Sequence, residues 1–420
     1  MPPYGGSTSI SPKWMQEALE LTYKTKLPAL SSVEITKDKI SGGFSGKLVR
    51  IRLHWSSPPP PELDIPSQMI VKSVQNQIQS LHASIMLGTP REAFFSREYG
   101  QNNRDPVLNV MPRVIYANGS WWSGEYVTVM EDLSIKRAFH GGVMLGNQCF
   151  GDVPVPENIK QDPLFVVETI FMQAANIHAR YWRDEGLLKF NWMKNVAWLQ
   201  GRERSSWEMA MINMRYKFNK VLRAIKRGNT QVPWSDHMIS TINNAFDNTN
   251  WHTFRANMNL SDPTTAFTLC HGDFHASNVL WCPASETNPK PRPYLIDWSE
   301  VGVFCPFTEL AQFIVSHVLV ADRRAHEREI FERYYRRLVE KGVDSNVFPL
   351  ETCWELYKRG GMERWLQMLI LLADISMNYP QALSDSHIAW FYNQVATFVE
   401  DHGTEQTLKS FSFMSAYCLA

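Results

Sequence analysis

One segment constrains this chain more than any other: residues 269–281 read LCHGDFHASNVLW, and residues 294–302 follow with YLIDWSEVG. Four residues separate Asp273 from Asn278, and a short apolar run before Asp297 is typical of a strand that presents a carboxylate at its end. This spacing matches a phosphoryl-transfer loop, in which Asp273 accepts the proton of a hydroxyl group. Asn278 and Asp297 are then the expected magnesium ligands.

The chemistry explains why these residue types are needed. A phosphoryl group in transfer spreads negative charge over several oxygens, so a magnesium ion held by hard oxygen ligands has to meet it. The alternative is that Asp273 and Asn278 only cap turns, as most Asp and Asn in such loops do. The register of Asn278 and the position of Asp297 favour the catalytic interpretation.

A glycine-rich turn lies far upstream, where GGFSG at residues 42–46 separates two strand-like runs. Backbone amides of Gly42, Gly43 and Gly46 would cover phosphates there, and Ser45 would add a hydroxyl group. The alternative is an ordinary hairpin turn.

Lys72 is the single lysine of an apolar strand, SQMIVKSV, that follows the glycine turn. This position suits pairing with the α- and β-phosphates of a nucleotide, although an isolated lysine is more often a surface residue. Its expected partner is a helix glutamate, with Glu98 preferred over Glu92. The two lie six residues apart and cannot share one helical face.

Residues 125–133, EYVTVMEDL, are typical of a buried strand that ends in a polar turn. Glu131 and Leu133 stand where the backbone of an interlobe hinge would bind adenine, whereas an acidic strand end explains the same residues. His178, His271 and His275 are interpreted as packing or bracing residues. The Trp- and Met-rich residues 190–260 are interpreted as helices that pack a core.

Composition excludes several classes of protein. The 420 residues predict two or three units, and 44% hydrophobic with 20% charged residues is ordinary for a folded chain. The charges of the 42 basic and 42 acidic residues cancel, so neither nucleic acid nor an anionic membrane is an expected partner.

The compartment is predicted from the cysteines and the N-terminus. Six dispersed cysteines without a CxxC pair indicate free thiols. We expect no signal peptide, because the N-terminus lacks the pattern of one. With no apolar run of about 20 residues, we expect a cytoplasmic protein.

With these motifs, the chain resembles the aminoglycoside phosphotransferase and choline kinase superfamily, and within it the ecdysteroid-kinase-like group with its choline-kinase-like domain. The resemblance implies the α+β class: a two-lobed, protein-kinase-like fold with a small lobe of antiparallel sheet plus helix and a large, mainly helical lobe. We expect the nucleotide-binding lobe at 1–133 and the catalytic and substrate-binding lobe at 134–420, with a helical insert at about 183–262. ATP, Mg²⁺ and a small-molecule alcohol are the implied cofactors and substrate.

One departure from the family pattern lies in GVFCPFTELA, where Glu309 stands at a position commonly occupied by aspartate. Three alternatives stay open: a choline or ethanolamine kinase proper, a catalytically silent nucleotide-binding scaffold, and, less favoured, a protein kinase. Against the first, Trp298-Ser299-Glu300 replaces the Phe-Glu-Tyr run of true choline kinases. The sequence does not identify the acceptor or the oligomeric state.

Overall fold

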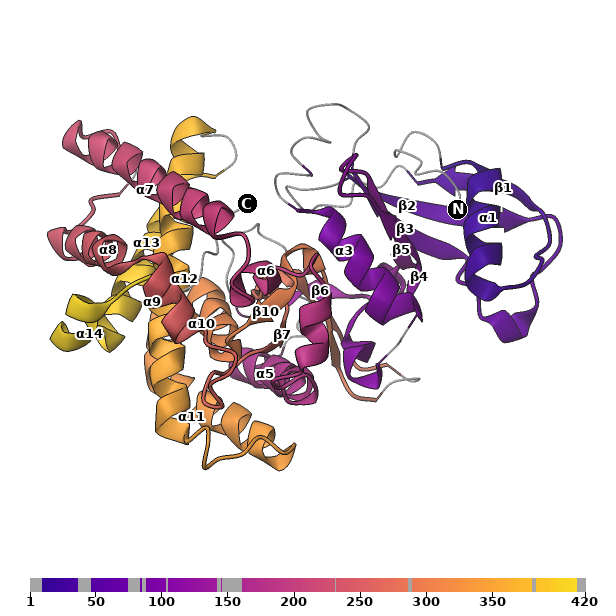
Figure 1. The fold of residues 1–420 in the computed structure, drawn as a ribbon. Helices are drawn as coiled ribbons and strands as arrows, with labels where there is room; N and C mark the ends of the chain where they lie inside the picture. The colour runs from indigo at the N-terminus through magenta and orange to yellow at the C-terminus, as the bar shows by residue number, and fades with distance from the viewer. Residues whose placement is uncertain are drawn as a thin grey trace. The chain divides into compact units, whose positions relative to one another are not determined.

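The computed structural model describes residues 10–36, 47–74, 84, 88–102, 105–141, 145, 161–230, 232–285, 289–379 and 383–413. The chain forms two compact units (Figure 1). The first contains residues 1–139 and 280–301, and the second contains residues 140–279 and 302–420. Residues 280–301 were expected in the large lobe, but they group with the first unit, where Cys282 and Tyr294 pack against Leu133.

The first unit is built on a five-stranded antiparallel sheet with the order β1-β2-β3-β5-β4. Aliphatic and aromatic residues at alternating positions give these segments the period of two that a strand requires. The strands are β1 (Leu30–Ile35), β2 (Lys47–Trp55), β3 (Gln68–Ser73), β4 (Val114–Gly119) and β5 (Tyr126–Glu131).

The two faces of this sheet carry different helices. Helix α1 (Pro12–Tyr23), capped by the Ser11 hydroxyl, buries Trp14 and Leu19 against Met69 and Val71 of β3. Because side chains alternate along a strand, Lys72 lies on the opposite face. There, Val74 and Tyr126 pack against Ala93 of helix α3 (Pro90–Phe95). The alternation therefore brings Lys72 to the α3 side of the sheet.

Two further parts of the first unit bear on the site. Helix α3 continues as a π-helix at Ser96–Asn102, where each amide bonds five residues back instead of four. A second sheet, mostly in this unit, has the order β6-β8-β9, with β6 at Phe139–His140, β8 at Val279–Cys282 and β9 at Arg292–Leu295.

The second unit is mainly helical. A short two-stranded sheet pairs β7 (Thr268–Cys270) with β10 (Gly302–Phe304) and supports the loop that carries Asp273. The helices are α5 (Pro163–Arg180), α6 (Val196–Leu199), α7 (Arg204–Lys226), α8 (Asp236–Asn248), α9 (Trp251–Asn257), α10 (Pro306–His317), α11 (Val320–Glu340), α12 (Leu350–Asn378), α13 (Asp385–His402) and α14 (Glu405–Ser410).

Helix α10 is buried on every side, and α12 packs closely along it. The approach depends on Gly360 and Gly361 of α12, because a Cβ on Gly361 would lie 2.6 Å from Ala311 Cβ and one on Gly360 would overlap Thr308. Any larger residue would therefore push the two helices apart. This contact fixes the side chains that both helices send toward the Asp273 loop.

The α+β class, with an antiparallel sheet plus helix in one unit and a mainly helical second unit, is confirmed. The Trp- and Met-rich stretch is helical, and Trp207, Met211 and Met214 are buried as expected of core residues. Among the described residues, no helix combines the length and apolar character needed to cross a bilayer.

Candidate active site

The first unit places Lys72 between two carboxylates. Its Nζ atom lies 2.6 Å from Glu92 Oε2 and 2.8 Å from Asp297 Oδ1. Lys72 and Glu92 are buried, with 7% and 4% of their surface exposed, while the Asp297 side chain keeps 23% exposed. One ammonium group between two carboxylates leaves one negative charge in excess, and the most accessible oxygens belong to Asp297.

The charge states follow from these contacts. Burial by itself would lower the pKa of Lys72, but Asp297 and Glu92 outweigh it, so the pKa of Lys72 is raised and the ammonium group stays charged. Burial raises the pKa of Glu92, which the charge of Lys72 offsets only in part. Burial likewise raises the pKa of Tyr126, the neighbouring phenol on this face of the sheet.

The choice of Glu98 as the partner of Lys72 was wrong, because the structure pairs Lys72 with Glu92. Glu92 lies in the first turn of α3, and Glu98 lies in the π-helical segment that follows. Six residues of an α-helix turn about 240° around the axis, so only one of the two glutamates faces the strand. Sequence alone did not show which face α3 turns toward β3.

Asp297 is held by its neighbours in the first unit. It follows β9 and adopts a left-handed conformation with φ of 61°. The next residue, Trp298, donates its indole N–H to the Leu295 carbonyl at 3.2 Å and stacks on Phe95 of α3 with ring centroids 4.7 Å apart. Arg91 of α3 donates to the Ser299 carbonyl at 2.7 Å. Helix α3 thus supplies Glu92 and also anchors the turn that carries Asp297.

The expected adenine hinge lies at the end of β5. The Glu131 carboxylate accepts a hydrogen bond from the Arg113 backbone amide at 2.8 Å. It also forms an ion pair with Lys136 at 2.8 Å. Leu133 is buried against Cys282 and Tyr294, from the β8–β9 hairpin. The structure therefore gives both residues structural contacts, and a role in binding adenine stays a prediction. The phosphate-covering residues Gly42, Gly43, Ser45 and Gly46 lie outside the described residues.

The second unit carries Asp273 on the loop after β7. Both carboxylate oxygens have donors: Gln312 Nε2 lies 3.0 Å from Oδ1, while Asn278 Nδ2 and His275 Nε2 lie 3.2 Å and 3.3 Å from Oδ2. Arg364 Nη2 lies 3.7 Å from Oδ1. The side chain still keeps 30% of its surface exposed, so its oxygens remain accessible.

Charge lowers the pKa of this aspartate. Burial by itself would raise the pKa of Asp273, but His275, Arg364 and His271 outweigh it and hold the pKa well below its usual value. A carboxylate of low basicity is suited to orient a hydroxyl group and to take its proton late in the transfer.

Asn278 is oriented by the same aspartate. Its Nδ2 donates to the Asp273 backbone carbonyl at 3.0 Å as well as to the carboxylate. With the nitrogen engaged, the carbonyl oxygen Oδ1 is left for another partner, and carbonyl and carboxylate oxygens are the ligands that Mg²⁺ accepts. The chemistry of Asn278 and Asp297 therefore fits the expected metal.

A buried network of hydrogen bonds holds the loop that carries Asp273. Glu309 Oε2 accepts the Gly272 amide at 3.1 Å, and Oε1 lies 2.6 Å from His178 Nε2, whose other ring nitrogen bonds Tyr334 at 2.7 Å. Gly272 needs its positive φ of 81° for this turn. His178, Cys270 and Glu309 also have metal-ligand spacing, but the His178 and Glu309 atoms already have protein partners. This agrees with a structural role for His178.

Two side chains around Asp273 were not identified from the sequence. Gln312 and Arg364 come from α10 and α12, and Arg364 also donates to Gln312 Oε1 at 3.1 Å and to the Gly272 carbonyl at 3.0 Å. His275, interpreted as a structural residue, lies against the carboxylate, and its role stays a prediction. A buried Gln and Arg in helices of apolar character were the available signals, but neither has a motif around it.

No curated protein sequence matches the chain. Residues 209–401 match a family model described as "Uncharacterized oxidoreductase dhs-27".

The structure is similar to several solved structures, and three of them are compared by identity, coverage and TM-score. A choline/ethanolamine kinase family protein from Mesorhizobium loti is 12% identical with a TM-score of 0.43, covering 96% of this chain and 98% of its own. A choline kinase from Streptococcus pneumoniae is 13% identical with a TM-score of 0.43, covering 92% and 98%. The GDP complex of aminoglycoside 2'-phosphotransferase-IIIa is 9% identical with a TM-score of 0.44, covering 93% and 99%.

Proposed function

We propose that this chain is a kinase that transfers the γ-phosphoryl group of ATP, with Mg²⁺, to a hydroxyl group of a small molecule. The observation that carries the proposal is the pairing of Lys72 with both Glu92 and Asp297. A lysine that an α-helix glutamate and a metal-binding aspartate hold in place is what phosphate positioning requires.

Each unit supplies part of this chemistry. Lys72 binds phosphate oxygens, and its contact with Glu92 keeps the ammonium group in one position. Asp273 orients the acceptor hydroxyl and takes its proton, while Asn278 and Asp297 would hold the metal ion. Bound Mg²⁺ would neutralise charge on the phosphate oxygens.

The description of the matched family model suggests a different class, an oxidoreductase. A dinucleotide-binding site of the Rossmann type needs parallel strands and a G-x-G-x-x-G turn that opens a helix. The five-stranded sheet here is antiparallel throughout, and that glycine pattern occurs nowhere in the sequence. These two features favour the kinase proposal.

The test is incubation of the purified protein with magnesium and ATP, or GTP, and a pooled library of small alcohols. Mass spectrometry then detects the gain of one phosphate, with Asp273→Asn as the control variant. A product made only by the parent protein supports the proposal and identifies the acceptor class. Binding of nucleotide without any product would favour the silent scaffold. Oxidation of a nicotinamide cofactor in a parallel assay, without phosphorylation, would favour the oxidoreductase.

A further inference from the structure

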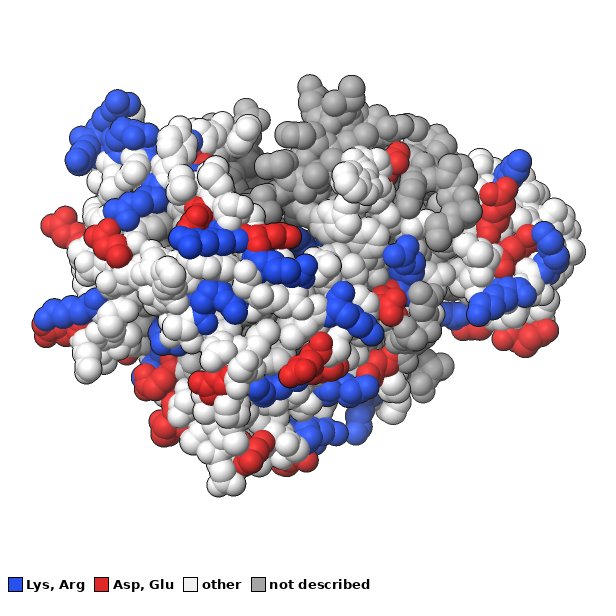
Figure 2. Space-filling model, viewed as in Figure 1, with Lys and Arg blue, Asp and Glu red and all other residues white. Residues whose placement is uncertain are grey.

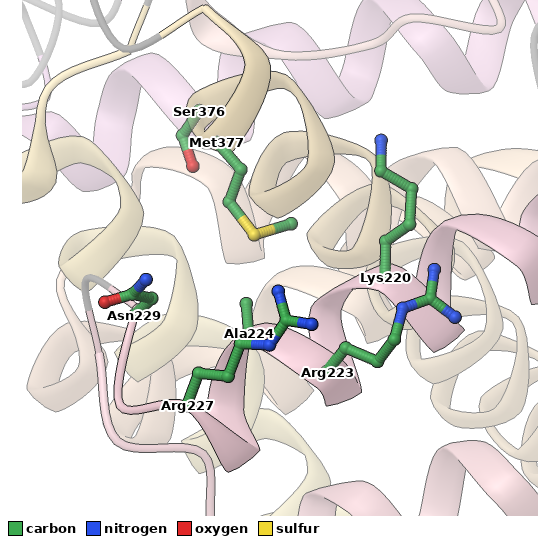
Figure 3. Close-up of a pocket in the computed structure, with 7 residues that line it drawn as sticks. All are labelled: Lys220, Arg223, Ala224, Arg227, Asn229, Ser376 and Met377. Carbon is green, nitrogen blue, oxygen red and sulfur yellow. The ribbon is translucent and has the colours of Figure 1, made fainter.

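A pocket in the second unit lies apart from the Asp273 loop, between helices α7 and α12. Its volume is about 510 Å³, within the range of roughly 300–1,000 Å³ usual for small-molecule sites. Three cationic side chains of α7 and its C-cap form one wall, and Met377 and Ser376 of α12 face them (Figure 3). The lining residues are Lys220, Arg223, Ala224, Arg227, Asn229, Ser376 and Met377.

The charge of this region differs from that of the whole chain. Residues 204–227 contain one acid, Glu208, while the complete chain has equal numbers of acids and bases. Basic side chains gather toward one end of α7 in the space-filling view (Figure 2). The basic residues of this stretch are Arg204, Arg215, Lys217, Lys220, Arg223, Lys226 and Arg227.

Among the described residues, two of the three pocket cations have no acidic partner. Lys220 pairs with Asp374 at 2.5 Å, which compensates its charge. Within the described part of the chain, neither Arg223 nor Arg227 forms an ion pair. By comparison, five of the six arginines of α11 have an acidic partner: Arg323, Arg324, Arg328, Arg333 and Arg337.

Basic residues at a helix C-terminus have an ordinary explanation, since they stabilise the partial negative charge of about half an electron at that end. That explanation accounts for cations in the last turn of α7. It does not account for a concave site into which Arg227, at the C-cap, and Asn229, beyond it, both contribute. The summed charge of the two guanidinium groups without an acidic partner also exceeds the partial charge at the helix end.

We infer that this pocket binds a small molecule that carries an oxyanion group, such as phosphate, sulfate or carboxylate. Guanidinium groups bind such groups with paired N–H donors, and Asn229 adds an amide donor. The Met377 thioether and the Ala224 methyl group give the ligand an apolar surface to cover. The favoured ligand is therefore an anion with a short apolar body.

The pocket is separate from the catalytic machinery. Arg364, which contacts the Asp273 loop, and Ser376, which lines the pocket, lie on the same continuous helix α12. The separation of twelve positions along the helix corresponds to about 18 Å along its axis. A small ligand in the pocket would not reach Asp273, so this site does not depend on the proposed kinase activity.

The experiment measures binding of hexyl phosphate, hexanoate, inorganic phosphate and hexanol to the full chain by calorimetry at fixed ionic strength. We expect hexyl phosphate to bind best, inorganic phosphate several-fold more weakly, and hexanol not at all. The variant R223Q/R227Q should weaken hexyl phosphate at least tenfold. The matched variant K217Q/K226Q removes the same charge from α7 without touching the pocket, so it should change binding less than about twofold.

Three results would overturn the inference. If none of the anions binds at concentrations up to about 10 mM, the pocket is not an anion-binding site. Equal weakening in both double variants would show only long-range attraction by a basic helix. Binding that Lys72→Met abolishes and R223Q/R227Q leaves intact would place the anion at the nucleotide site. Unfolding midpoints of the double variants, measured without ligand, identify loss of folding as a separate cause.

Discussion

Lys72 in the first unit and Asp273 in the second are both charged groups held by several partners, yet their surroundings differ. Lys72 lies between two full negative charges, whereas Asp273 accepts hydrogen bonds from two amide side chains and a histidine, with Arg364 at a longer 3.7 Å. The first arrangement leaves a surplus charge that suits a metal ion. The second fixes the direction of the carboxylate and leaves part of its surface exposed. The two roles proposed for these residues, phosphate binding and orientation of a hydroxyl group, are thus assigned to different environments.

The largest effect is expected at the base. Asp273→Asn keeps the shape and most hydrogen bonds but removes the proton acceptor, so turnover should fall by roughly 10² to 10⁴-fold. Nucleotide binding, measured by calorimetry, should be unchanged because the lysine site lies in the other unit. Turnover within twofold of the parent protein would show that Asp273 is not the base.

The lysine site should respond in stability as well as binding. Lys72→Met leaves the buried carboxylate of Glu92 uncompensated, which typically costs about 3–5 kcal/mol. The urea midpoint of the first unit should fall and nucleotide binding should be lost. The double variant Lys72→Met/Glu92→Leu should recover most of the stability without restoring binding. If the double variant is no more stable than the single one, the pair is not the cause.

Arg364→Met tests how far the charge of Arg364 lowers the pKa of Asp273. Removing this charge should raise the pKa of Asp273, move the acidic limb of the pH–turnover profile upward, and lower turnover about tenfold. Arg364→Lys keeps the charge but loses the forked contacts to Gln312 and Gly272, so turnover should fall with a smaller pH shift. A purely structural role would change stability while leaving the pH profile where it was.

A smaller effect is expected where the chain departs from the family pattern. Glu309→Gln retains an acceptor for the Gly272 amide and a partner for His178, but both bonds lose their charge assistance. The expected cost is about 1 kcal/mol. Hydrogen exchange at the Gly272 amide should accelerate accordingly, with turnover reduced less than about tenfold. Unchanged exchange would mean that other contacts hold the loop.

The smallest expected effect concerns acid unfolding. The pKa of Asp273 in the folded chain lies below its ordinary value of 3.8, so the unfolded state binds a proton first as the pH falls. Stability contributed by this group is present above that value and is lost as the pH falls toward the folded pKa. Unfolding free energy should therefore fall less steeply between about pH 5 and pH 2 in Asp273→Asn than in the parent protein. Parallel curves would contradict the lowered pKa.

How much the sequence predicted differs between these two sites. Asp273 and Asn278 lie five residues apart in one loop, so local spacing was enough to select both residues, while the hydrogen bond between them was found only in the structure. Lys72 on a strand and Asp297 at a strand end were identifiable for the same reason, since both belong to short elements with clear periodicity. The glutamate partner was not, because it depends on the rotation of α3 against the sheet.

The sequence by itself determined the alternation that turns Lys72 away from α1 and the loop that joins Asp273 to Asn278, and the resemblance of its motifs to a known family implied the antiparallel sheet of the first unit. Only the tertiary structure decided that Glu92 meets Lys72, that Gln312 and Arg364 surround Asp273, and that two arginines of α7 line a pocket against α12. Arg364 contacts Gly272 across 92 residues of sequence. Such contacts arise from the packing of α10 on the two glycines of α12, and packing is set by the whole core instead of by any local pattern.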